Sequence, residues 1–253
     1  MKILLSPAKT LDYDSELPEL TATQPLFKKQ ALELNEVLKT KSQKEISELM
    51  HLSDKLASLN VERYQDFSKK FTTSNARPAM YAFAGDVYTG LDAYSLSQTD
   101  VQKAQEKVRI LSGMYGYLRP LDLLQPYRLE MGTSMPVGDH KNLYQFWKET
   151  ITPSLNKELK KDELVVNLAS NEYFKAVNKK ELKGELITPV FKDFKNGKLK
   201  VISFFAKKAR GSMARFLVQQ DAQSLEDVLA FQADDYKYSE KDTVKENEPV
   251  FIR

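Results

Sequence analysis

Residues 186–206, LITPVFKDFKNGKLKVISFFA, contain the pattern that decides the fold class. The apolar segments 186–191 and 199–206 read as strands, and Asn196-Gly197 between them is the strongest hairpin signal in the chain. These two strands should therefore pair antiparallel. Pro189 lacks a backbone donor, which moves its strand to a sheet edge or a bulge.

The segments before this hairpin alternate between strand and helix patterns. Short apolar runs predict buried strands at residues 2–5, 78–84 and 164–168, and Gly85 and Gly90 mark a loop. Apolar residues at helical spacing predict helices over residues 25–38, 43–52, 53–67, 98–111, 144–159 and 172–177. A hairpin within this alternation favours an α/β protein, with a mixed sheet flanked by helices in a single compact domain over residues 1–253.

The composition limits the functional classes. Hydrophobic residues make up 42% of the 253-residue chain and charged residues 29%, which supports a buried core and argues against a disordered chain or a membrane protein. The apolar stretch at residues 3–5 is too short for a signal peptide, so we expect a cytoplasmic protein. Without cysteine, and with only His51 and His140, the chain predicts no disulfide, no metal site and no cofactor.

Positive charge is concentrated in one segment. Residues 175–215 carry twelve basic and three acidic side chains, a net charge of +9, whereas the whole chain has +3. The remainder therefore carries −6, and residues 221–253 hold nine acids against four bases. A basic segment in a nearly neutral protein indicates a local anionic ligand. The alternative is a set of solvated lysines in turns.

A glycine pair lies in residues 111–120, LSGMYGYLRP, directly after an amphipathic helix pattern. This order predicts a helix-hairpin-helix-like element in which Pro120 starts a second helical turn. Backbone N–H groups at Gly113, Tyr115 and Gly116 could then approach a phosphate. Two residues separate the glycines where a typical turn of this kind has one. A helix C-cap turn without a ligand is therefore the alternative.

Residues 204–218 separate into two helical faces at 100° per residue. One side is apolar and consists of Ala206, Ala209, Met213, Phe216 and Leu217. The opposite side is basic and consists of Lys207, Lys208, Arg210 and Arg215. Gly211 falls on the basic side, where it costs about 1 kcal/mol of helix propensity relative to alanine. A glycine on the basic side indicates that a phosphate or a base approaches the helix backbone there. The alternative is a kink in the helix.

Two polar loops follow predicted strands, which is a common place for ligands in α/β sheets. Residues 6–10, SPAKT, lack the glycines of a P-loop, and residues 167–173 are rich in Asn and Ser. Together they define a possible pocket for a phosphorylated small molecule, with the lining residues Ser6, Lys9, Thr10, Asn167, Ser170 and Glu172.

Strings spread over the whole chain are similar to those of the YaaA family, bacterial proteins associated with resistance to peroxide stress. They are LSPAKTLD (5–12), FAGDVYTG (83–90), LSGMYGYLRPLD (111–122), PYRLEMG (126–132), YQFW (144–147), NLASNEYFK (167–175) and AKKARG (206–211). The resemblance implies a compact α/β fold peculiar to the family, a positively charged cleft, a helix-hairpin-helix element and binding of double-stranded DNA with low sequence specificity. It also implies a role in limiting the damage that arises when peroxide meets free iron.

On the basis of this resemblance, the hairpin corresponds to residues 112–116, and the cleft charge to Lys9, Arg119, Arg128, Lys207, Lys208 and Arg210. The resemblance assigns no catalytic residue. Three functions stay open: binding of double-stranded or branched DNA, an enzyme acting on a nucleotide or another phosphorylated small molecule, and a scaffold for an anionic protein. Steep salt dependence without a metal requirement would distinguish the first.

Overall fold

The computed structural model describes residues 1–253 and centres on a five-stranded sheet. The strand order is β6-β5-β1-β8-β9; strands β5, β1, β8 and β9 run parallel, whereas β6 is antiparallel to β5. These strands are β1 (Lys2–Leu5), β5 (Val108–Ser112), β6 (Gly116–Leu118), β8 (Leu164–Asn167) and β9 (Glu185–Ile187). The predicted mixed sheet is confirmed.

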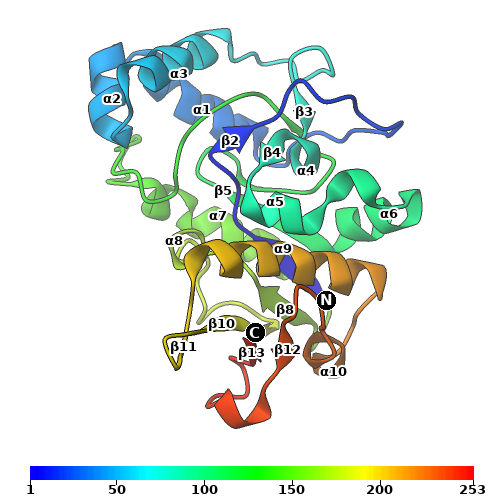
Figure 1. Cartoon of the computed structure of the whole chain (residues 1–253). Coiled ribbons are helices and arrows are strands. Elements are labelled where there is room, and N and C mark those ends of the chain that lie inside the picture. The colour runs from blue at the N-terminus through cyan, green and yellow to red at the C-terminus, as the bar shows by residue number, and fades with distance from the viewer.

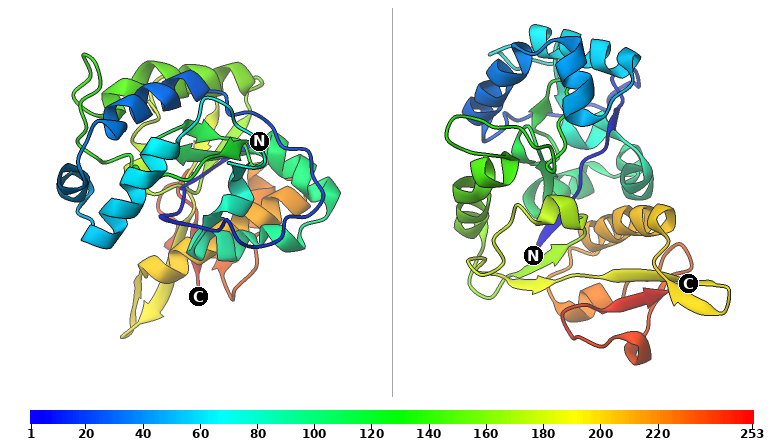
Figure 2. Two further views of the ribbon diagram at one scale, coloured as in Figure 1. Left: turned by 90° about the horizontal axis from the view of Figure 1, so that it is seen from above. Right: turned by 90° about the vertical axis from the view of Figure 1, so that its left-hand side faces the viewer.

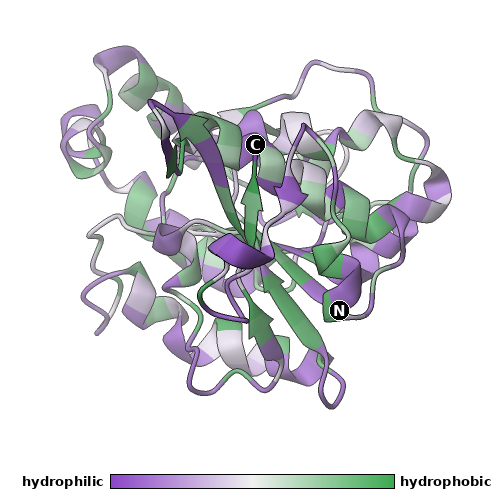
Figure 3. Cartoon of the chain, turned by 60° about the horizontal axis from the view of Figure 1, so that its bottom comes forward, coloured by the Kyte–Doolittle hydropathy of each residue, from purple (hydrophilic) through white to green (hydrophobic).

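The central strand β1 explains why this sheet forms the core. Ile3 pairs with Val108 on one side and with Val166 on the other. Strands that are covered on both faces read as continuous apolar runs, and residues 3–5 are completely buried. Figure 3 shows the inner strands as hydrophobic and much of the surrounding helical surface as hydrophilic.

A second sheet, ordered β11-β10-β13-β12, contains the predicted hairpin. Strands β10 and β11 are antiparallel, and Asn196 (φ 54°) and Gly197 (φ 72°) both adopt the left-handed conformation that a two-residue type I′ turn requires. The strands are β10 (Val190–Lys195), β11 (Lys198–Lys200), β12 (Lys237–Tyr238) and β13 (Val250–Ile252). Two short pairs join β2 (Thr10–Leu11) to β4 (Phe83–Ala84), and β3 (Arg77–Pro78) to β7 (Leu123–Leu124).

Ten α-helices surround the sheets (Figure 1). They are α1 (Lys28–Lys39), α2 (Gln43–Met50), α3 (Asp54–Asp66), α4 (Ala79–Ala82), α5 (Asp86–Leu91), α6 (Gln98–Lys107), α7 (Leu143–Glu158), α8 (Asn171–Phe174), α9 (Ser203–Gln219) and α10 (Leu225–Leu229). Helices α1–α3 lie at one end of the molecule and the four-stranded sheet at the other (Figures 1 and 2). None of the helices combines the length and the apolar character needed to cross a membrane.

Five predicted elements differ in the structure. The predicted strand 186–191 is divided between β9 in the five-stranded sheet and β10 in the four-stranded sheet, with Pro189 in neither strand. Helix α4 interrupts the predicted strand 78–84, because residues 79–82 are all buried and a fully apolar run carries no period. The predicted loop at residues 85–90 lies mostly within α5. The predicted helix 98–111 ends at Lys107, because the following β-branched and apolar residues form β5 beside β1. The predicted strand 199–206 ends at Lys200, before α9 begins.

The glycine-containing segment 111–120 forms a β-hairpin between β5 and β6, so the predicted helix-hairpin-helix-like element is wrong at this position. A Cβ atom on Gly113 would lie 2.3 Å from a backbone carbonyl oxygen, and Gly116, at φ 65°, packs against the Trp147 ring. Both glycines are buried, as is Tyr115. These three residues therefore pack inside the protein, and their backbone amides do not reach the surface.

Helices α5 and α9 cross in direct backbone contact. A Cβ atom on Gly90 would lie 2.1 Å from the Lys208 carbonyl oxygen, and one on Gly211 would lie 1.8 Å from the Val87 carbonyl oxygen. The interpretation of Gly211 as an opening for phosphate is therefore wrong, because the glycine admits a neighbouring helix. The apolar face of α9 is confirmed, with Ala206, Ala209, Met213 and Leu217 buried and Phe216 partly buried.

Candidate nucleic-acid interface

The β10–β11 hairpin, residues 190–200, protrudes from the body of the molecule (Figure 2, yellow). We call it the basic arm because it carries Lys192, Lys195, Lys198 and Lys200 and a single acidic residue, Asp193. That carboxylate is paired with another cation, and no lysine of the arm forms an ion pair. The basic arm is thus the least compensated part of the basic segment 175–215.

Strand pairing places three of the lysines on one face of the basic arm. Asp193 lies opposite Lys200 and Lys195 lies opposite Lys198. Because side chains alternate along a strand, Lys195, Lys198 and Lys200 point to the same face. Like charges directly opposite each other destabilise an antiparallel pair. An anionic ligand on this face would remove that repulsion.

Buried Asp193 does not neutralise the lysines because other donors occupy it. It accepts a hydrogen bond from the Tyr236 hydroxyl at 2.7 Å, and Arg253 donates to it through Nε at 2.9 Å. Burial raises the pKa of Tyr236, and the hydrogen bond to Asp193 raises it further, so the phenol stays protonated as the donor. This buried cluster anchors the base of the arm.

Exposed apolar side chains accompany the lysines. Phe194 in β10 is 63% exposed and, by the same alternation, shares its face with Lys192 and not with the three clustered lysines. Val201 is 56% exposed, and Phe204 at the start of α9 is 59% exposed. The Arg253 guanidinium covers the neighbouring Phe205 ring, 4.1 Å from its centroid. Aromatic rings beside lysines are typical of surfaces on which bases stack while cations contact phosphates.

The four cations of the predicted basic face of α9 lie in three different environments. Lys207, which is exposed, and Arg210, which is partly buried, line one hollow together with the loop after β1. Lys208 instead pairs with Asp234, at 2.7 Å from Nζ to Oδ1. Arg215 donates to the backbone at the end of α5. The four cations that the sequence places on one helical face therefore do not share one binding surface.

The other predicted cations do not extend this hollow into one continuous basic cleft. Arg119 pairs with buried Asp122 at 2.7 Å and lines a separate hollow at the amino end of β1. Lys9 and Arg128 both pair with Glu130, each at 2.9 Å. Carboxylates thus compensate four of the six predicted cleft cations, Lys208 included, which leaves Lys207 and Arg210 unpaired.

The residues predicted for a small-molecule pocket meet in space, with one exception. A hollow of about 470 Å³ lies beyond the carboxyl ends of β1 and β8, and its lining includes Ser6, Lys9, Thr10, Ser170, Glu172, Lys207 and Arg210. Asn167 does not line it. Its side chain is buried, and its Oδ1 accepts a hydrogen bond from the Ala169 N–H at 3.1 Å, which stabilises the turn after β8.

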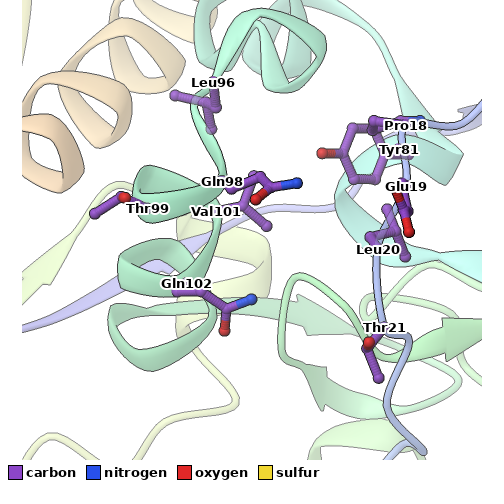
Figure 4. A pocket seen from close by; sticks show the side chains of 10 residues that line it. All are labelled: Pro18, Glu19, Leu20, Thr21, Tyr81, Leu96, Gln98, Thr99, Val101 and Gln102. Carbon is purple, nitrogen blue, oxygen red and sulfur yellow. The ribbon is translucent and has the colours of Figure 1, made fainter.

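A further hollow, of about 520 Å³, lies between residues 18–21 and α6 (Figure 4). Its polar lining consists of Glu19, Thr21, Gln98, Thr99 and Gln102, without a lysine or arginine. It therefore offers little attraction to an anion. Nowhere in the molecule do three or more His, Asp or Glu side chains converge in a way that could hold a metal ion.

Lys195, Lys198 and Lys200 are candidate DNA-contacting residues that the sequence analysis did not single out. A signal for them exists, because a two-residue hairpin loop at Asn196-Gly197 places Lys195 directly opposite Lys198. The charge of segment 175–215 points to the part of the chain that contains the arm. Only the hairpin register identifies which of its lysines lie together.

A family described as "Peroxide stress protein YaaA" matches residues 1–242 of the chain. A UPF0246 protein of Flavobacterium johnsoniae is 58% identical over 253 residues, 100% of both chains. A UPF0246 protein of Flavobacterium psychrophilum is 53% identical over the same full lengths. One from a Marinomonas species is 55% identical over 253 residues, which cover 100% of this chain and 97% of that protein.

Proposed function

The chain belongs to the YaaA family of peroxide stress proteins, and we propose that it acts in the cytoplasm by binding DNA through the basic arm. The contacts go to phosphates, which position a duplex without reading its sequence. Double-stranded and branched DNA are the partners that this surface suits. The hollow lined by Lys207 and Arg210 is not needed for this function.

One observation carries the proposal: three uncompensated lysines share one face of a protruding hairpin, and two of them lie directly opposite each other. In the free protein this arrangement is unfavourable by up to about 1 kcal/mol for the opposed pair. Duplex DNA carries one negative charge for roughly every 1.7 Å of its axis. Contacts with several phosphates would turn the repulsion within the arm into attraction.

Counterion release connects such binding to peroxide stress. DNA holds a condensed layer of cations, and a protein that neutralises phosphates with lysine displaces them. Where free iron is among those cations, its reaction with peroxide takes place on the DNA. An arm that occupies the phosphates removes iron from the covered stretch, so the chain would protect DNA without binding iron itself.

Replacing Lys195, Lys198 and Lys200 together with glutamine should weaken DNA binding and flatten its salt dependence. Each lost phosphate contact lowers the slope of log affinity against log salt by about 0.9 on duplex DNA, so three lost contacts lower it by about 2.7. Fluorescence anisotropy with duplexes of several sequences, titrated between about 50 and 200 mM salt, measures both quantities. The change should be the same for every sequence.

The matched control replaces Lys44, Lys148 and Lys245, which are exposed and paired with nearby glutamates. It removes the same charge from the chain and leaves the basic arm intact. We expect it to keep the wild-type slope. Equal losses in the two triple variants would mean that overall charge attracts the DNA, and the basic arm would no longer be the interface.

Phe194→Ala should distinguish the forms of DNA. Stacking of an unpaired base on an aromatic ring contributes about 1–3 kcal/mol, so binding to a four-way junction or single strand should weaken from about fivefold to about 150-fold. Continuous duplex, whose bases are already stacked, should bind almost as before. Val244→Ala, which truncates an apolar side chain that is 94% exposed and lies outside the basic arm, serves as the control. An equal loss on duplex would contradict a stacking role.

A further inference from the structure

The hollow lined by Lys207 and Arg210 of α9 lies at the point where the strand order of the five-stranded sheet reverses. From β1 the chain reaches β5 on one side of the sheet, whereas β8 and then β9 lie on the other side. The connection that leaves the carboxyl end of β1 and the one that leaves the carboxyl end of β8 therefore run to opposite sides of the sheet. Open α/β sheets bind ligands in the crevice at such a switch point.

Hydrogen bonds hold the two strand ends together at this hollow. The Ser6 side-chain oxygen accepts from the Ser170 N–H at 2.8 Å, and the Ser6 carbonyl oxygen accepts from the Tyr88 hydroxyl at 3.1 Å. Loop 6–10, the start of α8 and helix α5 are thereby fixed relative to one another. A preformed pocket in which a few placed polar groups orient the ligand is typical of small-molecule sites.

Arg210 is the more deeply buried of the two cations in this hollow that lack a partner. Its guanidinium forms no ion pair or hydrogen bond within the protein, and its Nε is buried without an acceptor. Burial lowers the pKa of Arg210, which reflects the free-energy cost of holding the cation away from water. Buried charges are normally compensated by an opposite charge. A bound anion in the hollow would supply that compensation.

Lys207 adds a second unpaired cation to the same lining. A planar guanidinium binds two oxygen atoms of a phosphate at once, and an ammonium adds a compact positive charge beside it. The close crossing of α5 and α9 at Gly90 and Gly211 fixes the backbone of the helix that carries both side chains. The neighbouring Lys208, bound to Asp234, takes no part.

The hollow also contains groups that suit a ligand's donors. Asp86 and Glu172 line it, and Glu172 accepts a hydrogen bond from the Gly132 N–H at 3.1 Å. An ionised carboxylate only accepts hydrogen bonds, so these two side chains suit hydroxyl or amino groups. Lys9 contributes less charge, because Glu130 pairs with it. The lining therefore calls for a ligand with both an anionic group and neutral donors.

We infer that this hollow binds a small phosphate monoester of sugar or nucleotide size, with its phosphate on Arg210 and Lys207 and its hydroxyl groups on Asp86 and Glu172. The volume of about 470 Å³ falls within the range of known small-molecule sites. The site goes beyond the DNA-binding function proposed above. No lysine of the basic arm lines it.

Calorimetric titration of the full chain with AMP, ribose 5-phosphate and inorganic phosphate tests this site. At least one of the two esters should bind, and more tightly than inorganic phosphate. Arg210→Gln should weaken ester binding between about tenfold and a hundredfold, because it removes charge-assisted hydrogen bonds. Lys207→Gln should weaken it less. Lys208→Gln, at the next position of the same helix, is the matched control and should retain wild-type affinity.

Three results would overturn the site: no binding of any probe, equal binding of ester and inorganic phosphate, or equal losses in Arg210→Gln and Lys208→Gln. Arg210 forms no hydrogen bond or ion pair within the protein and its burial is uncompensated, so the unfolding temperature of its variant should not fall below that of the wild type. DNA titration separates the two functions. Arg210→Gln should keep duplex affinity, and the arm triple variant should keep ester binding. If Arg210→Gln lost DNA binding as well, the hollow would belong to the DNA surface and not to a separate ligand.

Discussion

Replacing Gly211 with alanine is expected to lower the free energy of unfolding by about 3 kcal/mol. The new Cβ atom would lie 1.8 Å from the Val87 carbonyl oxygen and 2.8 Å from the Leu91 backbone nitrogen. Both are backbone atoms of α5, so no side-chain rotation relieves the clash and the helices must separate. The gain in helix propensity from glycine to alanine, about 1 kcal/mol, is smaller than this loss. Urea unfolding followed by circular dichroism measures the difference.

Gly138→Ala provides the comparison for this variant. Gly138 has φ 53°, and no atom lies within 4 Å of the position that an alanine methyl group would occupy, so the substitution incurs only the conformational cost, about 1–2 kcal/mol. Gly90→Ala should resemble Gly211→Ala, and the double variant should lose less than the sum, because the two contacts lie in one helix crossing. A loss at Gly211 no larger than that at Gly138 would show that α9 moves away from α5 without resistance.

Glu158→Ala is expected to lower the free energy of unfolding by about 3–5 kcal/mol, because it leaves a buried cation without its partner. The Arg109 side chain is only 5% exposed, and its Nε donates to Glu158 at 2.8 Å. The Tyr117 hydroxyl donates to the other carboxylate oxygen at 2.6 Å. This cluster joins the end of α7 to β5 and β6. Glu149→Ala on the exposed side of the same helix should change stability by less than about 0.5 kcal/mol.

The effect of Glu158→Ala should also depend on pH. Burial alone would raise the pKa of Glu158, but the hydrogen bond and charge of Arg109, with Tyr117 and Lys2, hold it below its ordinary value of 4.5. A carboxylate with a depressed pKa stabilises the fold fully above its unfolded value, and this contribution disappears as the pH falls through the folded value. The gap between wild type and variant should therefore be constant above pH 4.5 and shrink below it. Urea unfolding at a series of pH values would detect this, and a gap independent of pH would contradict it.

Local patterns in the sequence were sufficient where one conformation is strongly preferred. Helices α1–α3 and α7 and strands β1 and β8 follow from apolar spacing, and the β10–β11 hairpin follows from Asn196-Gly197, which tolerates positive φ on both residues. Buried apolar runs such as residues 79–82 carry no such preference. Their conformation depends on the neighbours that cover them, so the predicted strand there was interrupted by a helix.

Charge along the chain was a weaker guide to the site. The sequence concentrated twelve cations in residues 175–215, but it could not show which of them have partners. Lys208 is paired with Asp234, 26 residues away, whereas Arg210 and Lys207 face an open hollow. Loop 6–10 and Ser170 reach that hollow only because β1 and β8 are adjacent in the sheet, 164 residues apart in sequence at the Ser6–Ser170 hydrogen bond.

The sequence by itself determined the family, the α/β class, the hairpin and the segment in which the cations lie. Only the tertiary structure decided what the glycines are for. Gly113 and Gly211 looked like openings for a phosphate, but each accommodates backbone from a distant segment, at Leu129 and Val87. A glycine permits close approach by any group, and its own sequence context does not say which group arrives. That choice is made by packing between segments far apart in the chain, which local preferences do not encode.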